Sequence, residues 1–150
     1  MSQSLTKLYV HIIFHVKNDS CLIQPEDHQE LYAYIGGVIK ISKSIPININ
    51  GIENHVHILC ILSKNSSLAD LLEDIKRNSS RWIKTRGIHY QDFAWQGGYS
   101  GYSVSPSKVK VVDQYIENQK SHHKHQTFQE EYIQFLKEHG VDYEEDYLWN

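Results

Sequence analysis

The sequence predicts an α+β fold of the ferredoxin-like (RRM-like) class, with a four-stranded antiparallel sheet, helices on one face and additional C-terminal helices. Two observations predict this class. Segments with strand and helix patterns follow one another in the order β-α-β-β-α-β, and two further helical segments come after them. The 150 residues contain no internal repeat and no low-complexity linker. We therefore expect one domain over residues 1–150, ending in an acidic, aromatic tail over about 140–150.

The predicted strands are rich in β-branched and aromatic residues. Residues 55–62 form a continuous apolar run that is short enough for a buried strand, and residues 45–50 alternate between apolar and polar. Residues 51–54 join these two segments as a hairpin or tight connection. The other two strands are expected within residues 7–17 and within the aromatic, glycine-rich segment 93–104.

The predicted helices combine apolar residues at helical spacing with recognised start signals. Residues 68–86 form the clearest amphipathic helix. First-turn prolines and a Thr-x-x-Glu capping box mark the starts of the other three helices. These signals are Pro25, Ser105–Pro106, and Thr127 with Glu130, and the last helix is expected to end at Gly140.

Composition argues against several classes of protein. No apolar stretch approaches the ~20 residues that span a membrane, and Met1-Ser2-Gln3 opens no signal peptide. Cys21 and Cys60 are too few for a disulfide scaffold. We therefore expect a cytoplasmic protein.

The net charge of −3 by itself argues against a nucleic-acid partner, but the charge is unevenly distributed. Residues 126–150 contain seven acidic residues and one lysine, a balance of −6, so the other 125 residues carry +3. A polyanion docks on local patches, so this distribution leaves nucleic-acid binding open. The tyrosine, leucine and tryptophan of the tail favour docking on the domain over disorder.

His55 and His57 are the first candidate for chemistry. Side chains two apart in a strand lie on one face, ~6.5–7 Å apart along the backbone, so these two imidazoles can share one metal ion. A His-x-His pair in a strand is more often structural than metal-binding, so the pair alone does not establish a metal site.

Tyr115 and Gln119 are the second candidate. Four residues apart in a segment with helical period, they are neighbours on one helix face. A histidine pair on a rigid strand, opposed by a helix with a hydroxyl and an amide, suits metal-assisted phosphoryl transfer with tyrosine as nucleophile. The alternative is that both side chains simply pack and form hydrogen bonds. The sequence shows no obvious general base for the tyrosine.

Three further groups are candidate contacts to a nucleic acid. Cations one turn apart can follow a phosphate backbone, aromatic residues between glycines can stack on unpaired bases, and a histidine seven residues after Tyr115 shares its helix face. These candidates are Arg77, Arg81 and Lys84, then Tyr99 and Tyr102 beside Trp95, and finally His122. The alternatives are a solvated helix face, core aromatic residues, and a His122–His125 tract that complements a helix end instead of binding zinc.

Four blocks of sequence resemble the HUH-type single-tyrosine transposases of small bacterial insertion sequences, the IS200-like group with its REP-associated relatives. The blocks read Gly51-Ile-Glu-Asn-His-Val-His-Ile-Leu, Ile75-Lys-Arg-Asn-Ser-Ser-Arg-Trp, Phe93-Ala-Trp-Gln-Gly-Gly-Tyr-Ser-Gly-Tyr-Ser-Val-Ser and Tyr115-Ile-Glu-Asn-Gln-Lys-Ser-His-His. Their order and spacing are more specific than any one block, and the resemblance covers essentially the whole chain.

The resemblance implies a site and an activity. His55 and His57 match the histidines that bind a divalent metal, Mg²⁺ or Mn²⁺, and Gln119 matches the third ligand. Tyr115 matches the nucleophile. The family cuts and rejoins single-stranded DNA through a 5′-phosphotyrosine intermediate. The implied partners are single-stranded DNA with hairpin-containing ends and a second copy of the chain, in a homodimer with shared active sites.

One feature departs from the pattern of the family, because a transposase is usually basic overall and this chain is not. The departure bears on DNA affinity more than on chemistry, since the excess acid lies in the tail. A non-catalytic single-stranded nucleic-acid-binding domain derived from such an enzyme is the alternative function. A small metal-binding or structural protein is a third, which leaves the Tyr115 segment and the basic helix unexplained.

Overall fold

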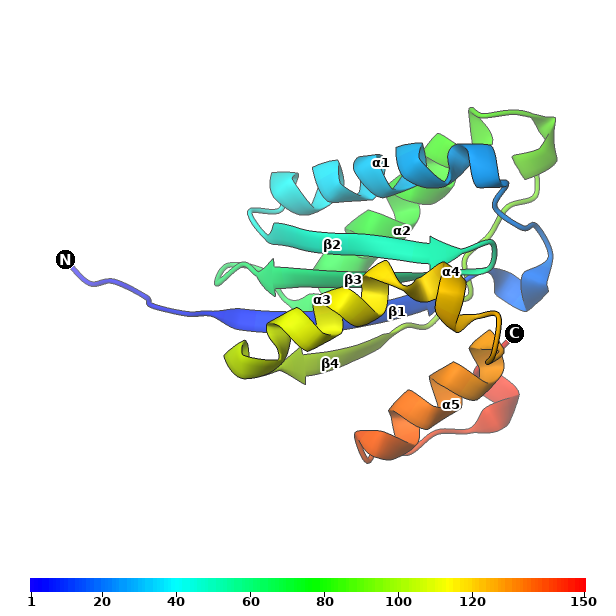
Figure 1. Cartoon of the computed structure of the whole chain (residues 1–150). Helices are drawn as coiled ribbons and strands as arrows, with labels where there is room; N and C mark the ends of the chain where they lie inside the picture. The colour runs from blue at the N-terminus through cyan, green and yellow to red at the C-terminus, as the bar shows by residue number, and fades with distance from the viewer.

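The computed structural model describes all 150 residues and contains one four-stranded sheet (Figure 1). Its strands are β1 (Leu8–His15), β2 (Ile45–Ile52), β3 (His55–Leu62) and β4 (Ser100–Val104). They lie in the order β2-β3-β1-β4, and every neighbouring pair is antiparallel. This is the ferredoxin-like sheet that the sequence predicts, and β3 has the predicted bounds.

One face of the sheet is covered by α1 (His28–Ile41) and α2 (Leu68–Lys84) (Figure 1). Every second side chain of β1 and β3 points toward these helices and contributes to the larger apolar core. These fully buried side chains include Ile12, Phe14, Val56 and Ile58. No helix of the chain is long and apolar enough to cross a membrane.

The opposite face carries the C-terminal helices α3 (Val109–Glu117), α4 (Gln119–His122) and α5 (Phe128–Glu138) (Figure 1). The remaining side chains of β1 and β3 point this way, and four of them are buried histidines, His11, His15, His55 and His57. A small apolar cluster lies beside them, formed by Ile13, Tyr102, Phe128 and Tyr132. The sheet therefore separates an apolar core from a polar, buried centre.

The helix starts predicted from the sequence are confirmed. A short 3₁₀ turn precedes two of the helices, Pro25–Asp27 before α1 and Pro106–Lys108 before α3. Thr127 and Glu130 form the predicted capping box at the start of α5. Gly140 follows α5 with a φ of 64°, a left-handed conformation that ends a helix at little cost only in glycine.

Tyr115 and Gln119 do not share one continuous helix, contrary to the prediction from their spacing. Asn118 separates α3 from α4 with non-helical backbone angles, φ −91° and ψ 17°. The side-chain amide of Asn50 on β2 donates to the carbonyl oxygens of the last two residues of α3, at 2.9 and 3.2 Å. These carbonyl groups thus have a partner outside the helix, which favours the end of α3 at this point.

The acidic tail docks on the domain, as its composition predicts. His15 Nε2 lies 2.8 Å from the carbonyl oxygen of Leu148, within hydrogen-bond distance. The ring of Trp149 packs against Phe128 and Tyr132, with centroid distances of 6.3 and 5.9 Å. The tail therefore braces α5 against the end of β1.

Candidate active site

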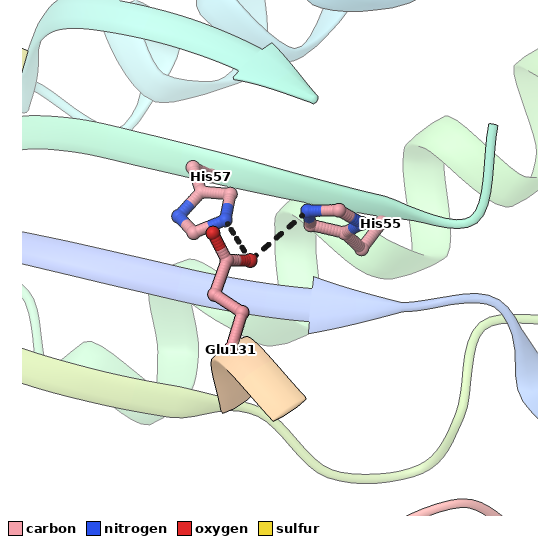
Figure 2. Close-up of side chains that lie close together, drawn as sticks. All are labelled: His55, His57 and Glu131. Atoms are coloured by element: carbon pink, nitrogen blue, oxygen red, sulfur yellow. Dashed lines mark hydrogen bonds and ion pairs between the residues drawn. The ribbon is translucent and has the colours of Figure 1, made fainter. Parts of the chain in front are cut away.

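β3 places His55 and His57 next to each other on the sheet face that α3, α4 and α5 cover (Figure 2). Both side chains are fully buried, and their ring centroids are 5.0 Å apart. The common orientation expected from strand alternation is present, so the two imidazoles can serve one centre.

Glu131 of α5 lies against the histidine pair and was not among the residues predicted from the sequence (Figure 2). Its Oε1 lies 3.0 Å from His57 Nε2 and 3.4 Å from His55 Nε2, and its side chain is 1% exposed. The sequence carried one signal. Glu131 lies at helical spacing within an apolar stripe that also includes Phe128 and Phe135, an unusual position for an acid.

Gln119 and Tyr115 reach the same centre from α4 and α3. The side-chain oxygen of Gln119 lies 2.9 Å from His55 Nε2, and its amide donates to Glu131 Oε2 at 3.0 Å. The Tyr115 hydroxyl donates to the same carboxylate oxygen. One chain therefore brings the tyrosine, the amide and the histidine pair together, despite the break between α3 and α4.

Burial and hydrogen bonding set the charge states of the site. Burial lowers the pKa of His55 to about 4, so this ring is neutral at pH 7. Burial acts to raise the pKa of Glu131, but hydrogen bonds with three histidines outweigh it and hold that pKa well below its usual range. Burial, together with the Glu131 charge, raises the pKa of Tyr115 and keeps its phenol protonated.

The partners of His55 indicate a place for a cation. A neutral imidazole carries only one N–H. Nδ1 of His55 lies 2.8 Å from Asn54 Oδ1, which can only accept. Nε2 faces two further acceptors, Gln119 Oε1 and Glu131 Oε1. At least one of these contacts therefore lacks a hydrogen, and converging lone pairs of this kind fit a metal ion. His55, His57 and Glu131 could together hold one.

His11 of β1 contacts the ring nitrogen of His57 that does not face Glu131. Its Nε2 is 2.8 Å from His57 Nδ1, so the two rings share a hydrogen bond. Burial, with His57 as a further cause, lowers the pKa of His11 well below its usual range and keeps it neutral. This contact leaves Nε2 of His57 facing Glu131, which is the orientation that a metal ligand needs.

Two histidines of the tract 122–125, at the end of α4, point into the site. His123 Nε2 lies 3.2 Å from Glu131 Oε1, and His122 Nε2 lies 3.3 Å from the Tyr115 hydroxyl. The predicted proximity of His122 to Tyr115 is confirmed. The sequence interpretation of this tract as a cationic helix end does not account for these contacts. His122 and His123 form, with Glu131, a second group of side chains that could hold a metal ion.

The basic residues predicted to contact DNA lie on the other side of the sheet. α2 packs on the face opposite the histidine pair. Arg77 forms ion pairs with Glu73 at 3.2 Å and Asp74 at 3.0 Å, whereas Arg81 and Lys84 are exposed. The structure therefore does not bring these three cations to the site.

The two tyrosines predicted to stack on bases differ in exposure. Tyr102 is 5% exposed and packs against Phe135 and His139, with centroid distances of 5.6 and 4.2 Å. Its ring faces are thus not open to a base, which corrects the prediction for this residue. Tyr99 is 37% exposed and lies beside Arg77 in a groove next to α2.

Two other lysines lie at the site. Lys120 and Lys124 are exposed and line a cleft together with His123, the residue that contacts Glu131. Cations in this position can meet the phosphates of a strand that approaches the buried centre.

Two solved structures share this fold. A protein of Deinococcus radiodurans R1, described as a candidate transposase, is 20% identical with a TM-score of 0.61, over 79% of this chain and 98% of that one. A REP-associated tyrosine transposase bound to a REP hairpin is 13% identical with a TM-score of 0.60, over 82% of this chain and 74% of that one. No curated protein matches the chain. At these identities the likeness establishes the fold alone.

A family model identifies the chain as a transposase. Residues 4–119 match the model described as "Transposase IS200 like". The chain belongs to this IS200-like transposase family. The match includes His55, His57, Tyr115 and Gln119 and ends before α5.

Proposed function

We propose that this chain is a metal-dependent transposase of single-stranded DNA that cleaves and rejoins a strand through a 5′-phosphotyrosine on Tyr115. The observation that carries the proposal is the convergence of the tyrosine hydroxyl, the histidine pair and Gln119 on one buried centre. Membership of a transposase family supports it.

His55, His57 and Gln119 would hold the divalent ion, Mg²⁺ or Mn²⁺. Two imidazoles and an amide are neutral ligands, so the ion keeps its charge and, when bound, offsets the charge of the scissile phosphate. The buried position of these side chains excludes water from the centre and fixes their geometry.

The proposed covalent step needs no external source of energy, because one phosphate ester bond forms as another breaks. The Tyr115 oxygen loses its proton, attacks phosphorus and forms the new P–O bond while the bond from phosphorus to the 3′ oxygen breaks. One proton passes to that 3′ oxygen, which leaves as a hydroxyl, so the proton lost by the phenol is balanced. His122, whose Nε2 lies 3.3 Å from the hydroxyl, would take the phenolic proton, whereas Glu131, with its lowered pKa, would orient the hydroxyl. Attack of a 3′-hydroxyl on the phosphotyrosine reverses the step and rejoins the strand.

The proposed DNA partner is a single strand with a hairpin near the cleavage point, and activity on DNA would place the protein in the cytoplasm. A transposase of similar fold is bound to a REP hairpin. A homodimer that exchanges the Tyr115 helix would build the same site from two chains. A subunit-mixing experiment, given in the Discussion, separates these two assemblies.

An adduct assay tests the proposed function. Labelled single-stranded DNA is incubated with the protein and Mg²⁺ or Mn²⁺ and then resolved on a denaturing gel. We expect a covalent protein–DNA band that disappears when the metal is chelated and in Tyr115→Phe. Binding of the DNA without any adduct would instead identify a non-catalytic single-stranded nucleic-acid-binding domain.

A further inference from the structure

Glu131 divides its two carboxylate oxygens between the histidine pair and the nucleophile. Oε1 faces Nε2 of His57 at 3.0 Å and Nε2 of His55 at 3.4 Å. Oε2 accepts hydrogen bonds from the Tyr115 hydroxyl and from the Gln119 amide, the latter at 3.0 Å. One side chain therefore links every residue of the proposed site.

This carboxylate has no permanently charged cation among its contacts. It is 1% exposed, and the groups around it are imidazoles, an amide and a phenol. An ionised carboxylate is costly to bury unless a positive partner compensates it. A bound divalent cation would supply that partner.

The distances around Glu131 match the spacing of ligands on one ion. Ligand atoms ~2.1 Å from Mg²⁺ and at right angles to each other lie ~3 Å apart. Glu131 Oε1 is 3.0 Å from His57 Nε2, and Gln119 Oε1 is 2.9 Å from His55 Nε2. The contact of 3.4 Å between Glu131 and His55 is only slightly longer.

We propose that Glu131 is a fourth protein ligand of the metal ion, bound through Oε1, and that its Oε2 holds the Tyr115 hydroxyl beside that ion. The inference rests on the metal dependence proposed above and deepens it. Glu131 lies outside residues 4–119, which match the family model, so α5 contributes this ligand from beyond the matched region.

α5 is fixed firmly enough to position a ligand. Its first turn is held by the capping box, and Phe128 stacks on the ring of His55 with a centroid distance of 4.1 Å. Tyr132 packs against Trp149 of the docked tail. A carboxylate supported in this way adds one negative charge to an otherwise neutral ligand set. This charge strengthens the binding of a divalent cation and still leaves the ion a net positive charge toward the phosphate.

Calorimetric titration with Mn²⁺ alone, without DNA, tests the proposal. Glu131→Gln keeps the size of the side chain and an acceptor for Tyr115 but removes the charge. We expect its Mn²⁺ affinity to be at least about tenfold weaker than that of the unaltered protein. Glu73→Gln is the control, because the same change is made at an exposed position of α2, on the other face of the sheet, and its affinity should not change.

Two results would overturn the proposal and are distinguishable. If Glu131→Gln binds Mn²⁺ as tightly as the unaltered protein, or more tightly, Glu131 is not a ligand, while the proposed metal dependence stands. If the unaltered protein binds no Mn²⁺, both proposals fail.

A measurement on the unaltered protein covers the case in which Glu131→Gln does not fold. With ¹³C in the glutamate carboxyl carbons, a small amount of Mn²⁺ should broaden the NMR resonance of Glu131 before those of exposed, remote glutamates such as Glu73. Failure to broaden the Glu131 resonance would overturn the proposal.

Discussion

The orientation of His57 depends on a second buried histidine. His11 shares a hydrogen bond with it at 2.8 Å, and the two rings stack with centroids 5.1 Å apart. A partner of this kind fixes the tautomer and the direction of a metal-ligating imidazole. His15, on the same face of β1, bonds instead to the backbone of the tail. These neighbouring histidines therefore have different roles.

His11→Phe should lower metal affinity. Phenylalanine keeps an aromatic ring packed against Phe135 but cannot share a hydrogen bond with His57. We expect Mn²⁺ binding about 10- to 100-fold weaker, measured by calorimetry. His89→Phe, at an exposed position away from the site, is the control and should bind Mn²⁺ normally. Unchanged affinity in His11→Phe would contradict the orienting role.

The buried histidines also make the stability of the metal-free chain depend on pH. Burial lowers the pKa of His55 from 6.5 to about 4. Between these pH values the unfolded chain binds more protons at this residue than the folded chain, so the free energy of unfolding decreases as the pH falls. Burial also lowers the pKa of His11 and His15, which adds to this loss of stability at low pH. The raised pKa of His123 has the opposite effect on the free energy of unfolding.

We expect the free energy of unfolding, measured with urea, to fall between pH 7 and pH 4, with His55 contributing up to about 3 kcal/mol. The exposed His89 provides a control, since His89→Gln should keep the same pH profile. A free energy of unfolding that stays constant over this range would show that the buried histidines do not resist protonation.

At the scale of elements, the C-terminal helices carry three of the candidate site residues, Tyr115, Gln119 and Glu131, and two lysines lie next to them. Lys120 and Lys124 line a cleft together with His123. The basic residues of α2 lie on the other face of the sheet. We therefore expect the segment after α3, and not α2, to make the main contact with DNA.

Replacing Lys120 and Lys124 by glutamine should weaken binding to single-stranded DNA. The slope of log affinity against log salt concentration should decrease by about 1.4, because each phosphate contact on a single strand contributes about 0.7. Replacing Arg81 and Lys84 removes the same charge from α2 and should change the slope less. A larger effect of the α2 pair would support the DNA contact predicted from the sequence for Arg77, Arg81 and Lys84.

Local patterns were sufficient to predict most elements and the common orientation of the histidine pair. The continuous apolar run 55–62 predicted a strand, the alternation of side chains in a strand placed His55 and His57 on one face, and the capping box located α5. The break at Asn118 was not predictable, because it involves the side chain of Asn50, 68 residues away in the sequence. Glu131 was missed for a similar reason, since only the packing of α5 on the sheet shows what its carboxylate contacts.

At the scale of the whole molecule, one chain contains a complete set of candidate site residues. The Tyr115 hydroxyl reaches the carboxylate that also contacts His57, so no second copy is needed to join them. The glycine-rich segment before β4 and the loop after it lie between this helix and the histidine strand in the sequence. Exchange of the helix between two chains would use the same contacts.

Mixing two inactive variants distinguishes these assemblies. His57→Ala and Tyr115→Phe each remove one part of the site. If each chain uses its own tyrosine, a mixture of the two variants should form no DNA adduct. Recovery of adduct formation in confirmed heterodimers would show that the tyrosine of one chain works with the histidines of its partner, as the family resemblance implies.

The identity of the nucleophile is the central claim, and mass spectrometry of the trapped protein–DNA adduct tests it most directly. Tyr115 is the tyrosine whose hydroxyl lies at the buried centre with the histidine pair and Gln119. After digestion of the protein and of the DNA, we expect a single modified peptide that carries a 5′-phosphate ester on Tyr115. A nucleotide attached to Tyr99, to another tyrosine or to a serine would contradict the account.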